Sequence, residues 1–227
     1  MRPTKKKKDR STLKKAPKQA PPDKALIRRY LKVSELKRLI ALADTDLRTS
    51  ALIRLIYGCA MRREEPGILI LDYAREMHKT GRIYIHRGKG SHSGYVDLDK
   101  DTQVILSKWV TFAYKGRTRS PEDFIFPGQK GKGITGRTVY NIYNKLTTRL
   151  KFRTELRHPH VLKRSRAQHL IEDMVEQGLD PWHALQAIAQ LIGHASAQTT
   201  IQNYIAQSGE ERQMAQKITT KLLRKRK

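Results

Sequence analysis

Four side chains in the last third of the chain have the chemistry needed to act on a phosphodiester. His160 and Lys163 stand three positions apart, so on a helix they project from one face. His194 follows a glycine, and Tyr204 comes ten residues later. Cations can neutralise the charge on phosphate oxygens, and a phenol beside cations ionises more readily and becomes a nucleophile. These residue types together predict covalent attack on a phosphodiester.

The charge of the chain indicates which phosphodiester this is. Lys and Arg total 47 against 21 acidic residues, which gives a formal net charge of +26. Such a chain attracts polyanions, so we expect double-stranded DNA as the partner, bound more weakly as salt rises. An anionic membrane is the weaker alternative, and since no apolar run is long enough to cross one we expect no membrane association. The single cysteine, Cys59, fits a small core residue in a reducing cytosol, so we expect a cytoplasmic, DNA-associated protein.

Two further cations precede this group in the chain. Arg62 follows a strongly apolar helical stretch, where its planar fork can hold two phosphate oxygens, and Glu65 can orient the guanidinium from the next turn. Lys89 lies between two glycines at a predicted hairpin tip, from which a long cation can reach a phosphate or protonate a leaving oxygen. Each residue alone also has an ordinary explanation. Arg62 could simply be a charged residue at a helix end, and Lys89 an exposed turn residue. The histidines could be helix caps or core residues, and Tyr204 could be a core residue.

Hydrophobic periodicity predicts a mainly α-helical protein with a small antiparallel β-sheet (α+β). With 227 residues, 38% of them hydrophobic, the chain can bury a core, and its length favours one domain with tails. Apolar residues at helical spacing predict helices at 34–43, 47–59, 101–114, 137–150, 161–177, 181–192 and 210–224. Alternation of apolar and polar residues at 82–87, followed by a second short strand pattern at 95–98, predicts a hairpin around Lys89. We expect Ser34 to cap the first helix. On the helix at 181–192 we expect an apolar stripe to pack in the core, formed by Leu185, Ile188, Leu191 and Ile192.

In chain order, the six residues singled out resemble the catalytic set of the tyrosine recombinase (phage-type integrase) family. The set is Arg62, Lys89, His160, Lys163, His194 and Tyr204. The resemblance runs from about Tyr30 to Tyr204 and rests on four motifs. Met61-Arg62-Arg63-Glu64-Glu65 looks like the first-arginine box, Gly88-Lys89-Gly90 like the hairpin-lysine turn, the segment 160–170 like the His-x-x-Arg box, and Leu191-Ile192-Gly193-His194 like the segment that leads to the nucleophile.

The sequence departs from the family pattern at three points. Lys163 stands where the family usually has its second arginine, so the cation keeps its charge and loses the bidentate fork. The spacing from His194 to Tyr204 is one residue longer than usual, so the segment that carries the tyrosine must bend differently. We also expect that only a basic tail precedes the catalytic region, without the helical domain that most members use to clamp DNA.

The resemblance implies a site-specific DNA recombinase or integrase that cuts and rejoins DNA through a 3′-phosphotyrosine intermediate, without a metal or other cofactor. Tyr204 would be the nucleophile, and Lys89 would protonate the departing 5′-hydroxyl. Arg62 and Lys163 would stabilise the transition state. The two histidines would assist proton removal (His160) and hydrogen-bond the phosphate (His194). The resemblance also implies a homo-tetramer on two DNA sites.

The family likeness divides the chain into three expected segments. They are a basic disordered tail (1–25), a tyrosine recombinase catalytic domain (26–208), and a C-terminal helix with a basic tail that is exchanged between protomers (209–227). Two other functions fit the same residues. A type IB topoisomerase would relax supercoiled DNA without a specific site. A non-catalytic DNA-binding protein on a degenerate recombinase scaffold would bind DNA without cleaving it.

Overall fold

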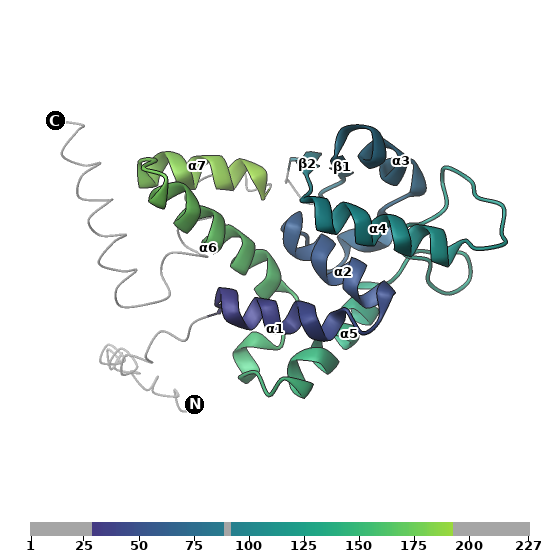
Figure 1. Ribbon diagram of the computed structural model, residues 1–227, viewed down its shortest axis with the longest axis horizontal. Coiled ribbons are helices and arrows are strands. Elements are labelled where there is room, and N and C mark those ends of the chain that lie inside the picture. The colour runs from purple at the N-terminus through teal and green to yellow at the C-terminus, as the bar shows by residue number, and fades with distance from the viewer. Residues whose placement is uncertain (1–28, 89–91, 193–227) are drawn as a thin grey trace, which may run out of the picture.

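The computed structural model describes residues 29–88 and 92–192, which form seven α-helices and one two-stranded sheet (Figure 1). The helices are α1 (Val33–Ala43), α2 (Leu47–Gly58), α3 (Leu71–Thr80), α4 (Lys100–Ala113), α5 (Gly136–Arg149), α6 (His160–Glu176) and α7 (Pro181–Leu191). Two short 3₁₀ helices cover Glu65–Ile68 and Thr154–Leu156, and strands β1 (Arg82–Ile85) and β2 (Gly94–Asp97) pair antiparallel. The predicted mainly α-helical fold with a small antiparallel sheet is confirmed.

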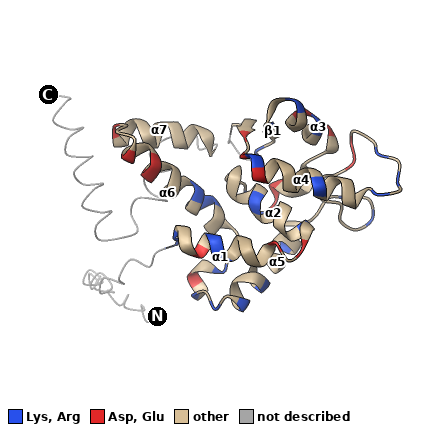
Figure 2. Cartoon of the chain, viewed as in Figure 1, with Lys and Arg blue, Asp and Glu red and all other residues tan. Residues whose placement is uncertain are grey.

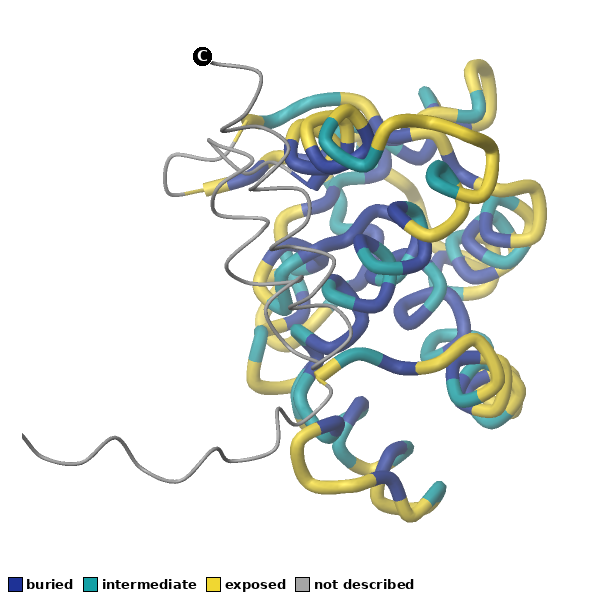
Figure 3. The backbone as a smooth tube through the Cα atoms, turned by 90° about the vertical axis from the view of Figure 1, so that its left-hand side faces the viewer, coloured by how far each residue is buried: buried dark blue, intermediate teal, exposed yellow. Residues whose placement is uncertain are grey.

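Helix α2 lies at the centre of the larger of two hydrophobic cores. Most of its side chains are buried, as expected of a helix that is apolar on nearly all sides. Helices α1, α4 and α6 pack against it, and α5 adds the fully buried ring of Tyr143. In Figure 3 the buried segments gather inside the molecule and the exposed ones surround them. This core gives the segment that follows α2 a rigid support.

Helices α6 and α7 form a second, smaller core at one side of the molecule (Figure 1). The chain turns between them at Gly178, whose φ of 86° favours glycine. Asp180 then caps α7 by accepting a hydrogen bond from the backbone N–H of Trp182. Helix α6 contributes to both cores, because Val161 of its first turn packs in the larger core and Ala167 packs in the smaller one. The first turn of α6 therefore lies where the two cores meet.

The hairpin of β1 and β2 has one buried face and one aromatic face. Ile83 pairs with Val96 on the inner face, while Tyr84 pairs with Tyr95 on the outer face with ring centroids 5.3 Å apart. Because side chains alternate along a strand, the inner positions of β1 are Ile83, Ile85 and then, just beyond its end, Arg87. Arg87 is buried, as this alternation requires.

Three details differ from the sequence-based expectations. Helix α1 begins at Val33 and not after a Ser34 cap, because Glu35 accepts a hydrogen bond from the backbone N–H of Lys32 at 2.8 Å and closes the first turn one residue earlier. Helix α3 was not predicted, since its narrow buried face is set among mostly polar residues. Leu191 is 37% exposed, so the prediction that it packs in the core is wrong.

The other predicted helices and the hairpin are confirmed to within about two residues, a normal difference at element ends. The predicted helix at 210–224 lies outside the described residues. Within residues 29–88 and 92–192, no helix combines the length and the apolar character needed to cross a membrane.

Candidate active site

The turn after α2 holds Arg62 in a fixed position. The chain leaves α2 through Ala60, whose φ of 48° lies in the left-handed region, which costs a non-glycine residue about 1–2 kcal/mol. Glu65 closes the turn: its carboxylate accepts hydrogen bonds from the backbone N–H of Arg62 at 2.7 Å and from Nη1 of the same residue at 3.2 Å. The side chain of Glu65 is 5% exposed and that of Arg62 is 30% exposed. The predicted role of Glu65 in orienting this guanidinium is confirmed.

His160 is the first residue of α6, one position before the predicted start of that helix. The ring of His158 stacks on it, with centroids 5.0 Å apart and planes 7° from parallel. Burial, followed by the charges of His158 and Arg164, lowers the pKa of His160 to about 4, against an opposing effect of Glu64. The imidazole is therefore neutral at pH 7, and its low pKa makes it a weak base until a bound phosphate raises that pKa.

Lys163 lies one helical turn further along α6 and is almost completely buried. Its side-chain nitrogen Nζ donates a hydrogen bond to the carbonyl oxygen of Ile192 at 2.8 Å. Burial lowers the pKa of Lys163 to about 7, the charges of Arg87 and Arg62 act in the same direction, and Glu65 opposes them. Near pH 7 the amine is thus divided between its charged and neutral forms, and an anion bound beside it would favour the charged form.

The charges along α6 run against the dipole of the helix (Figure 2). Its first half carries three cations and its second half three carboxylates: Lys163, Arg164 and Arg166, then Glu172, Asp173 and Glu176. A helix dipole disfavours this order, since cations are stabilising near the C-terminus and carboxylates near the N-terminus, by about 0.3–1 kcal/mol each. The arrangement concentrates positive potential around the first turn of α6, which suits the binding of an anion there.

A buried arginine that sequence reasoning did not single out lies beside these residues. Nη1 of Arg87 is 3.8 Å from Oε2 of Glu65, and the guanidinium also donates to backbone carbonyls of three residues. The signal that could have found it is the alternation of β1, because Arg87 continues the inward positions of Ile83 and Ile85. We call Arg62, Glu65, Arg87 and Lys163 the charged seam, since they lie where the two cores meet.

The structure brings together three of the six predicted catalytic residues. The charge of Arg62 acts on the pKa of Lys163, and the charge of Lys163 acts on the pKa of His160, so Lys163 lies within electrostatic reach of both residues. The remaining three lie outside the described residues: Lys89, His194 and Tyr204. The described chain ends in this region at Ile192, whose carbonyl contacts Lys163.

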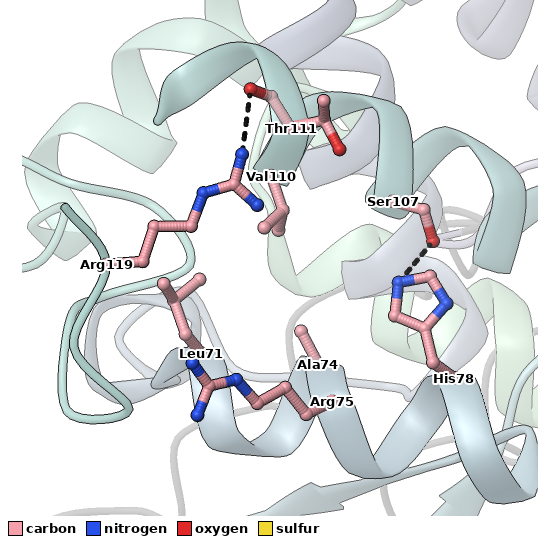
Figure 4. A pocket seen from close by; sticks show the side chains of 8 residues that line it. All are labelled: Leu71, Ala74, Arg75, His78, Ser107, Val110, Thr111 and Arg119. Carbon is pink, nitrogen blue, oxygen red and sulfur yellow. Dashed lines mark hydrogen bonds between the residues drawn. The ribbon is translucent and has the colours of Figure 1, made fainter. Parts of the chain in front are cut away.

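A shallow pocket of about 140 Å³ lies elsewhere, between α3 and α4 (Figure 4). Its lining consists of Leu71, Ala74, Arg75, His78, Ser107, Val110, Thr111 and Arg119, and includes no predicted catalytic residue. Several of its polar groups already pair with one another: Arg119 donates to the carbonyl of Thr111 at 3.4 Å, and the Ser107 hydroxyl lies 3.2 Å from Nε2 of His78. This pocket is therefore separate from the candidate active site.

Known proteins similar to this chain share both sequence and fold with it. The model of the phage integrase family matches residues 29–211. A curated tyrosine recombinase XerC from Oceanobacillus iheyensis is 31% identical over 184 residues, which cover 75% of this chain and 54% of the relative. A tyrosine recombinase XerD from Listeria monocytogenes is 26% identical over 179 residues, which cover 76% of this chain and 56% of the relative. The chain thus spans about half the length of these curated relatives.

Solved structures with the same fold agree with the sequence matches. The crystal structure of XerA recombinase matches with a TM-score of 0.65 and 23% identity, covering 87% of this chain and 66% of that one. XerH site-specific recombinase, bound to its palindromic difH substrate in a post-cleavage complex, matches with a TM-score of 0.61 and 24% identity, covering 78% of this chain and 49% of that one. At these identities the likeness shows a common fold.

Proposed function

The chain belongs to the phage integrase family, and we propose that it is a site-specific DNA recombinase that cuts and rejoins DNA through a 3′-phosphotyrosine intermediate. The observation that carries the proposal is the charged seam beside the first turn of α6: Glu65 contacts Arg62 and Arg87, Lys163 donates to the end of α7 beside Arg87, and His160 lies one turn before Lys163. A cation held by a buried carboxylate, a neutral imidazole and a buried amine suit a phosphodiester that undergoes attack. The relatives are named as recombinases, which favours this function over the relaxation of supercoils by a type IB topoisomerase.

Each residue has a defined task in the proposed reaction. The phenol oxygen of Tyr204 forms a bond to phosphorus while the bond from phosphorus to the 5′-oxygen breaks. The neutral imidazole of His160 takes the phenol proton, and Lys89 gives a proton to the departing oxygen. Arg62 and Lys163 neutralise the charge that develops on the phosphate oxygens, an effect worth several kcal/mol in other enzymes. His194 would hydrogen-bond the phosphate. The tasks of Tyr204, Lys89 and His194 rest on the family resemblance.

The proposed partners follow from charge and from the family. We propose that double-stranded DNA binds to the basic surface around the first turn of α6, and that a homo-tetramer assembles on two sites in the cytoplasm. The net charge of +26 supports the DNA partner. Within the tetramer we propose that residues 209–227 pass to a neighbouring protomer. A chain without residues 209–227 should then bind a single DNA site but fail to join two of them.

A covalent trapping experiment tests the proposal. The probe is a pool of nicked duplexes with randomised sequence around the nick, so that cleavage releases a short strand and the covalent complex cannot religate. We expect a denaturant-resistant protein–DNA adduct from the unmodified chain, and sequencing of its DNA identifies the preferred site. Tyr204→Phe should form no adduct. Tyr95→Phe is the matched control, because Tyr95 is an exposed tyrosine of β2 with no task in the proposed reaction and should behave like the unmodified chain.

The outcomes of this experiment separate the functions. Tight binding of the duplexes without any adduct would favour the non-catalytic DNA-binding protein. Relaxation of supercoiled plasmid by an adduct-forming chain, without preference for a sequence, would favour the topoisomerase. An adduct that forms equally well with Tyr204→Phe would show that another residue is the nucleophile.

A further inference from the structure

We propose that Arg87 is a positioning residue for the cleavage reaction, which ties the turn that leads from α2 to Arg62 to the end of α7. The inference rests on the proposed function and goes beyond it, because Arg87 is not among the residues assigned a chemical task. It acts on backbone carbonyls and not on the substrate.

The guanidinium of Arg87 contacts two segments that are distant in sequence. Its Nη2 donates to the carbonyl oxygen of Cys59 at 2.9 Å and to that of Leu191 at 3.1 Å. Its Nη1 donates to the carbonyl oxygen of Ala60 at 3.3 Å. Cys59 and Ala60 form the turn that leads from α2 to Arg62, and Leu191 is the last residue of α7. Arg87 itself stands two positions before Lys89.

These carbonyls lie at or just beyond the C-terminal ends of two helices: Cys59 is the C-cap residue of α2, Ala60 follows it, and Leu191 is the last residue of α7. The last four carbonyls of an α-helix have no intrahelical donor, and a cation near the C-terminus also interacts favourably with the dipole. Arg87 supplies donors after α2 and at the end of α7 together, and Lys163 donates to the carbonyl of Ile192, the C-cap residue that follows α7. The hydrogen bond from Arg87 to the Ala60 carbonyl also restrains a residue with positive φ, a conformation that persists where surrounding contacts enforce it.

The burial of Arg87 indicates that an arginine occupies this position because of its hydrogen bonds and not because of its size. The side chain of Arg87 is 2% exposed, and a charge so deeply buried is unfavourable unless it is paired and hydrogen-bonded. An apolar side chain at this inward position of the hairpin would pack without that cost. The planar fork can bond carbonyls of two segments at once, which a lysine amine does less well.

Hydrogen exchange of the full chain without DNA tests whether Arg87 ties these segments. In Arg87→Met, exchange at residues 59–62 and 188–192 should accelerate by about tenfold or more, because the segments lose their shared bonds. Arg87→Lys keeps the charge, so its exchange rates at these residues should lie between those of the unmodified chain and those of Arg87→Met. Arg82→Met is the matched control, since Arg82 begins the strand that precedes Arg87, its side chain is 51% exposed, and the charge change is identical. It should leave exchange at both segments unchanged.

Cleavage of the duplex recovered by covalent trapping tests whether the tie serves the reaction. Arg87→Met should form the adduct on the order of 100-fold more slowly at saturating DNA, as expected for misplaced reacting groups, with unchanged affinity for the duplex. The variant should also change the pH profile. The charged groups that act on Lys163 among the described residues are Arg87, Arg62 and Glu65, so loss of Arg87 raises the pKa of Lys163 and moves the alkaline decline in cleavage to higher pH.

Distinct results overturn the inference. Unchanged exchange in Arg87→Met would show that the segments do not depend on this residue. A slower reaction with an unshifted pH profile, not rescued by Arg87→Lys, would show general damage to the fold. If the unmodified chain forms no adduct with any duplex of the pool, the proposed function and the role of Arg87 in cleavage both fail, while the exchange rates still decide whether Arg87 ties the segments.

Discussion

The two hydrophobic cores of the molecule are built and connected in different ways. The larger core draws side chains from α1 to the start of α6 and from both strands, and includes the stacked rings of Trp109 and Phe126. The buried members of the smaller core are all aliphatic and come from α6, α7 and Ala60. The charged seam lies between them, and there Arg87 and Lys163 donate to the last carbonyls of α7.

This difference shows how a helical protein can fix the positions of catalytic groups. Apolar contacts are not directional, so an aliphatic core holds α6 and α7 together without strongly fixing the end of α7. Hydrogen bonds weaken steeply with distance and angle, so two buried cations on consecutive carbonyls fix that end closely. We interpret the larger core as the source of stability and the charged seam as the source of geometry.

The largest expected effect comes from removing the carboxylate of the charged seam. Glu65→Gln leaves Arg62, Arg87 and Lys163 close together without their negative partner, and should lower the free energy of unfolding by about 3–5 kcal/mol. Glu64→Gln is the matched control, since its side chain is 59% exposed and its ion pair contributes at most about 1 kcal/mol. Chemical denaturation measures both. Similar losses in the two variants would show that the charged seam is no more tightly coupled than the surface.

A pair of identical truncations then compares the two cores directly. Ile56→Ala in the larger core and Ile188→Ala in the smaller core each remove a fully buried side chain, at a cost of about 2–5 kcal/mol. We expect Ile56→Ala to destabilise the whole molecule and Ile188→Ala to accelerate hydrogen exchange in α6 and α7 alone. If Ile188→Ala loosens α1 and α4 equally, the two cores form one cooperative unit.

The pH dependence of cleavage should report on Lys163. Its amine carries charge below its pKa of about 7 and loses it as pH rises, so adduct formation should decline above pH 7 by up to about tenfold per pH unit. Bound phosphate favours the charged amine and moves the decline to higher pH. Lys163→Arg introduces a group that stays charged, so its decline should disappear. Identical profiles for both proteins would remove Lys163 from the reaction.

The smallest expected effect concerns a polar contact away from the charged seam. The hydroxyl of Tyr57 lies 2.9 Å from Nδ1 of His169, whose Nε2 donates to the carbonyl of Leu31 at 2.9 Å. Tyr57→Phe removes one half-buried hydrogen bond and should cost about 1 kcal/mol of unfolding free energy. Adduct formation should not change. A large loss of cleavage in this variant would extend the active site beyond the charged seam.

Much of the fold could be predicted because it follows from local patterns, and the same patterns placed three of the proposed site residues on described elements. The helices with wide apolar faces and the hairpin around Lys89 were predicted, whereas α3, with its narrow buried face, was missed. Arg62, His160 and Lys163 were found from residue type and spacing. The orienting contact from Glu65 to Arg62 was also found, because it spans a single turn.

The remaining features depend on contacts between distant segments, which no local pattern specifies. Arg87 was missed because arginine is normally exposed, although the alternation of β1 marked it as inward-facing. The burial of Lys163 could not be predicted, since it depends on the end of α7 reaching the first turn of α6. The same holds for the pKa of His160, which burial and the neighbouring ring of His158 lower.

The most direct test of the central claim is a structure of Tyr204→Phe bound to the duplex recovered by covalent trapping. The account predicts that one phosphate lies within hydrogen-bonding distance, about 3 Å, of the side chains of Arg62, His160 and Lys163, with the ring of residue 204 facing its phosphorus atom. A duplex bound on another face, such as the pocket between α3 and α4, with no phosphate at the first turn of α6, would contradict it.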